Sequence, residues 1–274
     1  STPSNSSAAS DVYKRQLHVR SKDFAGNISK KVSHFKFQID TVALPPNISS
    51  ITHPDSSRWY NLKKAQFKIS PPDDLSGIEG YYYLIDTSPK TIPDENSNWI
   101  DKDTIFSGDL KDGEWHIHII SKDKAGNTGK IASHFKFNID TVAKPPKVFS
   151  KTHSDQEKWY NNPNPELNWD TPEDLSGIEG YYYIFDTKYN TVPTKDIGTW
   201  TNSNQVTLPK LEDGIWYFHI VSKDNAGNIG WEAGHYKLKI DTKVEMPQII
   251  SPSHPDQNKW YNNPLIKLSW SVPK

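Results

Sequence analysis

The sequence repeats itself almost word for word, and the length of the repeat limits the folds open to the chain. The longest shared stretch is complete at 216–242, returns at 115–141 and, without its first two residues, occurs at 17–41. Equivalent residues such as Trp59 and Trp159 lie 100 positions apart. Solenoid repeats are only a few tens of residues long, whereas a unit of about 100 residues has the size of an independently folding domain. We therefore predict a string of similar domains.

Each copy of the shared stretch has the pattern of an antiparallel β-hairpin. Trp115, Ile117 and Ile119 occupy alternate positions before the segment Ser-Lys-Asp-x-Ala-Gly-Asn, and Phe135 and Phe137 do so after it. Only a strand places residues i, i+2 and i+4 on one face, so both runs indicate half-buried strands. In the segment between them, the aspartate is placed to accept backbone N–H groups. The glycine is placed to adopt the positive φ from which the second strand starts.

This repetition divides the chain into segments. Residues 17–41 are expected to form the C-terminal hairpin of a truncated repeat, and 244–274 the N-terminal strands of another. Between them, 43–141 and 143–242 are expected to be two complete β-sandwich repeats. The half-repeats lack their sandwich partners, so we expect them to exchange amide hydrogens faster than the complete repeats.

The N-terminal segment has a different character. Residues 6–16 read SSAASDVYKRQ, which resembles a translated sequencing adapter. We therefore expect residues 1–16 to be a sequencing artefact and disordered, and the chain to be a fragment of a longer protein. A natural Ser-rich linker is the alternative interpretation.

Composition supports an all-β fold. Only 34% of the residues are hydrophobic, yet the chain contains 10 Trp, 13 Tyr and 10 Phe. Such a chain has to build its cores from a few large rings, which is typical of β-proteins. Within 143–242, short alternating runs follow one another with a turn signal between each pair, and no helical pattern competes. We predict tandem antiparallel β-sandwich domains.

Three motifs give the repeats a family resemblance. Leu-x-Trp at 167–169, Gly-Tyr-x-Tyr at 180–183 and Leu-x-Asp-Gly-x-Trp at 211–216 resemble fibronectin type III-like or bacterial immunoglobulin-like repeats. The first repeat departs from that pattern with Ile69 in place of the Trp, and Trp216 replaces the Tyr of the family's tyrosine corner. Such repeats occur in tandem on secreted and surface-attached proteins. The resemblance therefore implies an extracellular or cell-surface location and a spacer or adhesive role.

The linkers between repeats share the sequence Ile-Asp-Thr-Val-Ala-x-Pro-Pro, at 39–46 and 139–146. Two consecutive prolines lock φ and remove two hydrogen-bond donors, which favours an extended path. We predict short, semi-rigid Pro-Pro linkers and an extended rod.

Several function classes are not indicated. The chain has 32 basic and 33 acidic residues, so there is no charge excess for nucleic acid. Zero cysteines exclude disulfides and thiol catalysis. No apolar run is long enough to span a membrane, and no hydrolase, phosphate-binding or metalloprotease motif is present. We predict that the chain is not an enzyme. Its predicted partners are neighbouring repeats of the same chain and a cell-surface glycan or protein.

Three carboxylates form the candidate metal site. The predicted strand order brings Asp174 and Asp224 to the same end of the sandwich as the preceding linker, which contains Asp140. Three carboxylates are what a hard cation such as Ca²⁺ requires. The interpretation that the sequence favours is that these side chains only bond the backbone of their own turns, and that no cofactor is bound.

A loop before the second strand of each repeat contains a His-x-Asp motif, which starts at His153 in the second repeat, followed by Trp159 and Tyr160. His-x-Asp provides only two metal ligands, so a hydrogen-bonded loop is favoured. The Trp-Tyr pair is either a platform on which a sugar ring stacks or a plug that closes the core. The plug is favoured, because burial of a Trp is strongly stabilising.

Tyr182 and His219 lie on the outward face of the sheet that contains the hairpin. They are candidates for a partner- or glycan-binding surface, and cross-strand aromatic pairing is the favoured alternative. Our main hypothesis is a non-catalytic extracellular spacer or adhesive stalk. The second is a carbohydrate- or protein-binding accessory module of a secreted hydrolase.

Overall fold

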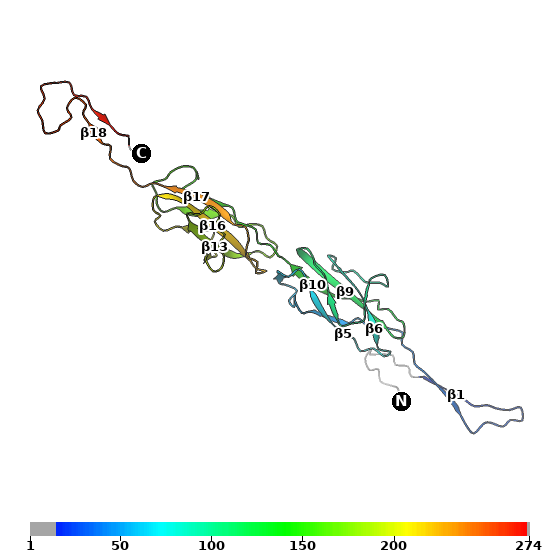
Figure 1. The fold of residues 1–274 in the computed structure, drawn as a ribbon. Helices are drawn as coiled ribbons and strands as arrows, with labels where there is room; N and C mark the ends of the chain where they lie inside the picture. Colours follow the sequence, from blue (N-terminus) through cyan, green and yellow to red (C-terminus); the bar gives the residue numbers. More distant parts are fainter. Residues whose placement is uncertain (1–14, 273–274) are drawn as a thin grey trace, which may run out of the picture. The chain divides into compact units, whose positions relative to one another are not determined.

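A computed structural model describes residues 15–272. Every regular element in that range is a β-strand (Figure 1), so the all-β prediction is confirmed. The first strand is β1 (Arg15–Val19). It includes Arg15 and Gln16, the last two residues of the segment that we interpret as an artefact. The rest of that segment lies outside the described residues. Among the described residues, no helix has the length and hydrophobicity that a membrane span requires.

The chain divides into two compact units. The first extends to Val142 and includes two short loops from later in the sequence, 174–177 and 224–228. The second unit begins at Ala143 and contains the remaining residues. Both loops belong by sequence to the second repeat. The two compact units therefore do not coincide with the two repeats.

The first unit contains a sandwich of two sheets. A three-stranded sheet has the order β3-β5-β8, from β3 (Asn47–Ser50), β5 (Gln66–Ser70) and β8 (Thr104–Phe106). The five-stranded sheet has the order β4-β10-β9-β6-β7, from β4 (Trp59–Tyr60), β10 (Ser133–Ile139), β9 (Gly113–Asp123), β6 (Ile78–Asp86) and β7 (Asn98–Ile100). All pairs are antiparallel except β4 with β10.

The core of the first unit lies between these two sheets. Phe67 and Ile69 from β5 face Ile117, Ile119 and Phe137 from the hairpin strands, and all five are buried. Successive side chains of a strand point to opposite faces, so the hydrophobic residues at alternate positions of the sequence lie on the face of each strand that points into the core. The rings of Phe67 and Phe137 meet edge to face, 5.1 Å between centroids.

The second unit repeats this architecture. One sheet has the order β11-β12-β15, from β11 (Val148–Ser150), β12 (Glu166–Trp169) and β15 (Gln205–Thr207). The other has the order β14-β13-β16-β17, from β14 (Thr199–Thr201), β13 (Ile178–Asp186), β16 (Gly214–Asp224) and β17 (Gly234–Ile240). The short segment around Trp200 forms the strand β14, which pairs with β13.

Aromatic and aliphatic side chains share the core of the second unit, so the expectation of a core built mainly from large rings holds only in part. Trp169 is 2% exposed, and its ring stacks on Phe218 with 5.9 Å between centroids. Tyr183 stacks on the same Phe218 ring at 5.5 Å. In the first unit Ile69 occupies the position of Trp169 and is also buried.

The predicted turn of the hairpins is confirmed. In the first unit Asp123 Oδ1 accepts the backbone N–H of Asn127 at 2.8 Å, and Asp123 O accepts the N–H of Gly126. The φ angle of Gly126 is 94°, and Gly26 and Gly227 have values of 90° and 97°. A side chain at this conformation would be strained, which explains the glycine in all three copies.

The start of the long strands β9 and β16 is fixed by an indole. Trp115 Nε1 donates to Lys111 O at 2.9 Å, and Trp216 Nε1 donates to Glu212 O at 3.0 Å. Both bonds run to a carbonyl four residues upstream. The tryptophan therefore makes the type of side chain to backbone bond for which the tyrosine corner is known.

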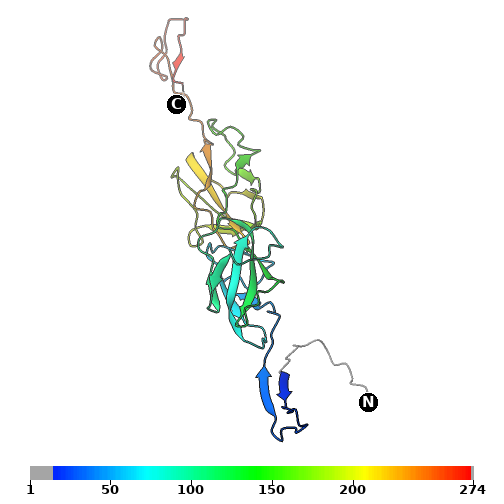
Figure 2. The same cartoon turned by 90° about the vertical axis from the view of Figure 1, so that its right-hand side faces the viewer.

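Among residues 15–272, each terminal strand pair forms a two-stranded sheet of its own. β1 pairs with β2 (Ser33–Phe37), and the two strands lie side by side (Figure 2). At the other end β18 (Ile249–Ile250) pairs with β19 (Ser269–Trp270). Phe35 is 67% exposed and Trp270 is 66% exposed, whereas Trp169, the equivalent of Trp270, is buried.

Candidate functional site

Asp140, Asp174 and Asp224 form a compact group. One carboxylate oxygen from each lies within 4.8 Å of the others. Asp140 directly follows β10, Asp174 lies in the loop after β12, and Asp224 is the last residue of β16. All three belong to the first compact unit, since that unit includes both loops.

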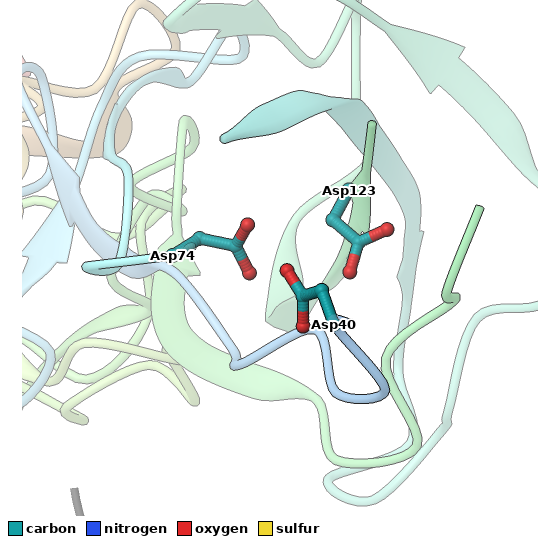
Figure 3. A group of neighbouring side chains, drawn as sticks. All are labelled: Asp40, Asp74 and Asp123. Carbon is teal, nitrogen blue, oxygen red and sulfur yellow. The ribbon is translucent and has the colours of Figure 1, made fainter. Parts of the chain in front are cut away.

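A second group of the same kind was not predicted. Asp40, Asp74 and Asp123 also place three carboxylate oxygens within 4.8 Å of one another (Figure 3). They occupy the equivalent positions one repeat earlier, in the first linker, the loop after β5 and the end of β9. The interval of 100 or 101 residues between equivalent aspartates was the signal that could have identified this group.

Hydrogen bonds orient each carboxylate of the predicted group. Asp140 Oδ2 and Asp174 Oδ1 both accept the backbone N–H of Ser176, at 3.0 and 3.1 Å. Asp224 accepts the backbone N–H and the side-chain amide of Asn228, at 2.8 and 2.6 Å. That amide also donates to the backbone carbonyl of Asp140 at 2.8 Å. Bonds within turns are therefore present, as the favoured interpretation predicted, and they also align the three carboxylates.

The group carries a concentrated negative charge. Asp140 and Asp224 are buried. Burial raises the pKa of the Asp174 carboxyl, and a hydrogen bond from Ser176 opposes this effect. The negative charges of Asp140 and Asp224 raise the pKa of Asp174 further. Burial also raises the pKa of Asp224, against the hydrogen bonds from Asn228.

The first group differs in its charge balance. Burial acts to raise the pKa of Asp40, but hydrogen bonds from Ser76 and Val42 outweigh it and hold that pKa below its ordinary value. Asp40 therefore keeps its charge more readily than Asp174 does. Asp40 Oδ2 accepts the backbone N–H of Ser76 at 3.0 Å, the same bond that Asp140 makes with Ser176.

The donor set suits a hard divalent cation. Two unit charges 4.8 Å apart repel each other by about 3.5 kcal/mol at an effective dielectric constant of about 20. Three ionised carboxylates in this space are therefore unfavourable unless a cation lies between them. Carboxylate oxygens are the ligands that Ca²⁺ prefers, and water and carbonyl oxygens usually complete its coordination.

The histidines of the first two His-x-Asp loops, His53 and His153, are buried hydrogen-bonded residues. His153 Nε2 lies 2.9 Å from Asn162 O, and His153 Nδ1 lies 2.9 Å from Thr152 Oγ1. Because a carbonyl can only accept, Nε2 carries the proton and Nδ1 accepts the threonine hydroxyl. Burial lowers the pKa of His153 despite the bond to Asn162. His53 makes the corresponding bonds to Leu62 and Thr52.

The proposed core plug is formed by Tyr160 and not by Trp159. The Tyr160 hydroxyl accepts the backbone N–H of Asp155 at 2.9 Å, and its ring lies 4.6 Å from that of His153. The expectation for Trp159 is wrong: its side chain is 48% exposed, and Lys239 Nζ lies 5.2 Å from its ring centroid. Tyr160 occupies the inner position because its backbone pairs with the end of β17.

Tyr182 and His219 do not form an open surface. Tyr182 is buried against the ring of Trp200, with 4.9 Å between centroids. Gly180, two residues earlier, leaves the space that this indole occupies, since an added Cβ would lie 2.6 Å from the ring. His219 is fully buried. The cross-strand aromatic pairing that we favoured is what the structure shows for Tyr182.

Comparisons with known proteins give structural likeness only. No family model and no curated protein matches the sequence. Among solved structures, the fibronectin(III)-like modules of Clostridium thermocellum CbhA align with a TM-score of 0.33 and 9% identity, over 73% of this chain and 97% of theirs. A Ca²⁺-stabilized adhesin that helps an Antarctic bacterium bind ice aligns with a TM-score of 0.41 and 13% identity. That alignment covers 87% of this chain and 59% of the adhesin. Neither likeness is close enough to transfer a function.

Proposed function

We propose that the chain is a non-catalytic spacer or adhesive stalk from a larger secreted or cell-surface protein, with two complete repeats at 43–141 and 143–242. The observation that supports this proposal is the duplication of a complete sandwich core. Each unit buries its own set of aromatic and aliphatic side chains from equivalent positions. A fold that closes its core in each repeat is suited to separating whatever its ends carry.

Hydrogen bonding supports the non-catalytic part of the proposal. His53 and His153, from the His-x-Asp motifs of the two complete repeats, are buried and bonded to backbone carbonyls. A general base needs to reach a substrate proton. These imidazoles are occupied in holding a loop.

We further propose that each aspartate group binds one Ca²⁺ ion. In the group of Asp140, Asp174 and Asp224, the ion would neutralise charges that otherwise raise the pKa of two of the carboxyls. Because Asp140 lies in the linker, Asp174 in the loop after β12 and Asp224 at the end of β16, the ion would connect the linker to that loop and that strand end. Cation binding would then stiffen the stalk.

Distance measurements between the repeats test the spacer proposal. The chain has no cysteine, so Lys102→Cys and Ser203→Cys, both at exposed positions, allow spin labelling at two chosen sites. A semi-rigid spacer gives a narrow distance distribution in Ca²⁺ that broadens with EDTA. A broad distribution in both conditions would show a loose tether and contradict the spacer role.

Calorimetry tests the cation separately. We expect EDTA to lower the melting temperature of the chain and Asp174→Asn to weaken the response to added Ca²⁺. Asp196→Asn, at an exposed aspartate outside both groups, is the matched control and should respond as the parent does. An identical melting curve in Ca²⁺ and in EDTA would rule out the metal site and leave the spacer role untouched.

The alternative, a carbohydrate-binding module, has one observation in its favour. Trp159 is half exposed in a loop, and a ring face of this kind can stack on a sugar. Glycan-array binding that disappears in Trp159→Ala, with an unchanged melting temperature, would favour this alternative. Binding that persists in the variant would count against it.

A further inference from the structure

Six of the ten histidines form three cross-strand pairs, which neither the spacer role nor the calcium proposal uses. In each pair the two residues face each other directly in an antiparallel hairpin, and their Nδ1 atoms are in contact. The pairs and their Nδ1 to Nδ1 distances are His18 with His34 at 2.7 Å, His118 with His134 at 2.6 Å, and His219 with His235 at 2.6 Å.

The first complete repeat fixes the tautomer of its inner imidazole. His118 is buried, and its Nε2 lies 3.2 Å from Asp86 Oδ1. Burial acts to raise the pKa of Asp86, but hydrogen bonds from Thr91, Ser88 and His118 hold it below its ordinary value. An ionised carboxylate can only accept, so Nε2 of His118 carries the proton. Its Nδ1 lone pair therefore points at the partner histidine.

The second complete repeat does the same with a different set of acceptors. His219 Nε2 lies 2.9 Å from Lys188 O and 3.3 Å from Asp186 Oδ1. Neither acceptor can donate, so this ring also has its proton on Nε2 and its lone pair on Nδ1. The outer member of the pair, His235, is exposed. The lone pair of the buried ring thus faces a site that solvent can reach.

The pKa values of both outer histidines are lowered from their ordinary value. Burial lowers the pKa of His134, and the neighbouring His118 and His116 lower it further. Burial and His219 lower the pKa of His235. Neutral imidazole is the form that binds metal ions.

The separation of the two Nδ1 atoms can be compared with the separations of nitrogen ligands in metal sites. With metal–nitrogen bonds of about 2.0 Å, two ligands at the right angle of a square plane lie about 2.8 Å apart, whereas a tetrahedral pair lies about 3.3 Å apart. The observed 2.6 Å is closer to the first value. Tetragonal nitrogen coordination is typical of Cu²⁺, which also forms the strongest complexes of the first-row divalent metals.

We propose that the pairs His118 with His134 and His219 with His235 each bind one Cu²⁺ ion through their two Nδ1 atoms. Water completes the coordination on the exposed side. When the metal binds, the proton that the outer histidine holds on Nδ1 moves to its Nε2 by exchange with solvent, so both rings stay neutral. Asp86 and Asp186 orient the inner rings from behind, as carboxylates do at many histidine–metal sites.

The N-terminal pair, His18 with His34, can be compared directly with the other two pairs. Within the part of the chain that the structure describes, no carboxylate bonds the ring of His18 or His34. The N-terminal pair therefore has the same contact without the orienting acceptor. We expect it to bind Cu²⁺ more weakly than the other two pairs, because loss of a supporting carboxylate typically weakens metal binding by about 10- to 100-fold.

Titration of the full chain with CuCl₂ alone, followed by calorimetry and electron paramagnetic resonance, tests the proposal. We expect two strong sites whose spectra show hyperfine coupling to two nitrogens. The double variant His134→Asn, His235→Asn changes only exposed side chains and should abolish both strong sites. His254→Asn, at a histidine outside the pairs, is the matched control and should keep both.

A second variant separates orientation from direct ligation. Asp186→Asn should weaken the site of the second repeat about 10-fold or more, while its spectrum keeps two nitrogen ligands. Strong copper binding that survives the double histidine variant would overturn the proposal. So would an absence of copper-dependent signals in a parent chain that melts cooperatively, since the pairs would then be hydrogen bonds only.

Discussion

The hydroxyl of Tyr236 offers a direct test of how the second repeat is stabilised. It donates to the backbone carbonyl of His153 at 2.6 Å, and both residues are buried. In the first repeat the equivalent residues are Phe135 and His53. The carbonyl of His53 therefore receives no hydrogen bond from a tyrosine hydroxyl. The two repeats thus differ by one buried hydrogen bond at matched positions.

We expect Tyr236→Phe to lower the free energy of unfolding of the second repeat by about 1–2 kcal/mol. The substitution removes one hydrogen bond, worth about 1 kcal/mol, and leaves a buried acceptor without a partner. For a domain of this size, 1 kcal/mol changes the melting temperature by roughly 4–8 °C. The reciprocal change, Phe135→Tyr, is expected to raise the stability of the first repeat by about 0.5–1 kcal/mol.

Hydrogen exchange read by mass spectrometry is the suitable assay, because peptides from β10 and β17 report on the two repeats separately. In Tyr236→Phe, exchange should accelerate in β17 and remain unchanged in β10. A change of less than about 0.3 kcal/mol in the second repeat, well under the usual worth of a buried hydrogen bond, would refute the reasoning.

Three further perturbations follow from the geometry. Gly180→Ala places a Cβ 2.6 Å from the Trp200 ring, so we expect a loss of about 1–3 kcal/mol, measured by urea denaturation. Trp216→Phe removes the bond to Glu212 and should cost about 1 kcal/mol in the same assay. The pKa of buried His153 is lowered from 6.5, so the unfolded chain binds the extra proton. The contribution of His153 to the free energy of unfolding is therefore fully present above pH 6.5 and is lost as the pH falls below that value. Denaturation curves at pH 7 and pH 5 should show the difference.

The fold could be predicted from the sequence because its strongest signals are local. Alternation places Trp169 and Phe218 on inward faces, and the turn residues define each hairpin without reference to the rest of the chain. The strand around Trp200 was not predicted, because it consists of three residues among turn signals. It exists because Gly180 lets the indole pack on the neighbouring strand.

The candidate sites were harder to predict because they depend on contacts between distant residues. Strand order was enough to group Asp140 with Asp174 and Asp224. The earlier group around Asp40 needed the repeat interval to be applied to the first linker as well. The contact between His219 and His235 needed the register of the hairpin, which sequence alternation leaves open by one step along the strand. Trp159 was misjudged because burial depends on which of two adjacent rings meets β17.

The indole hydrogen bonds of Trp115 and Trp216 are insensitive to alkaline pH. A tyrosine hydroxyl ionises near pH 10 and then can no longer donate, whereas an indole N–H does not titrate in water. Trp115 and Trp216 each donate an indole N–H to a backbone carbonyl oxygen. These two hydrogen bonds therefore keep their donors at alkaline pH. In strong base we therefore expect the Tyr236 hydroxyl to lose its hydrogen bond to His153 while both indole hydrogen bonds remain.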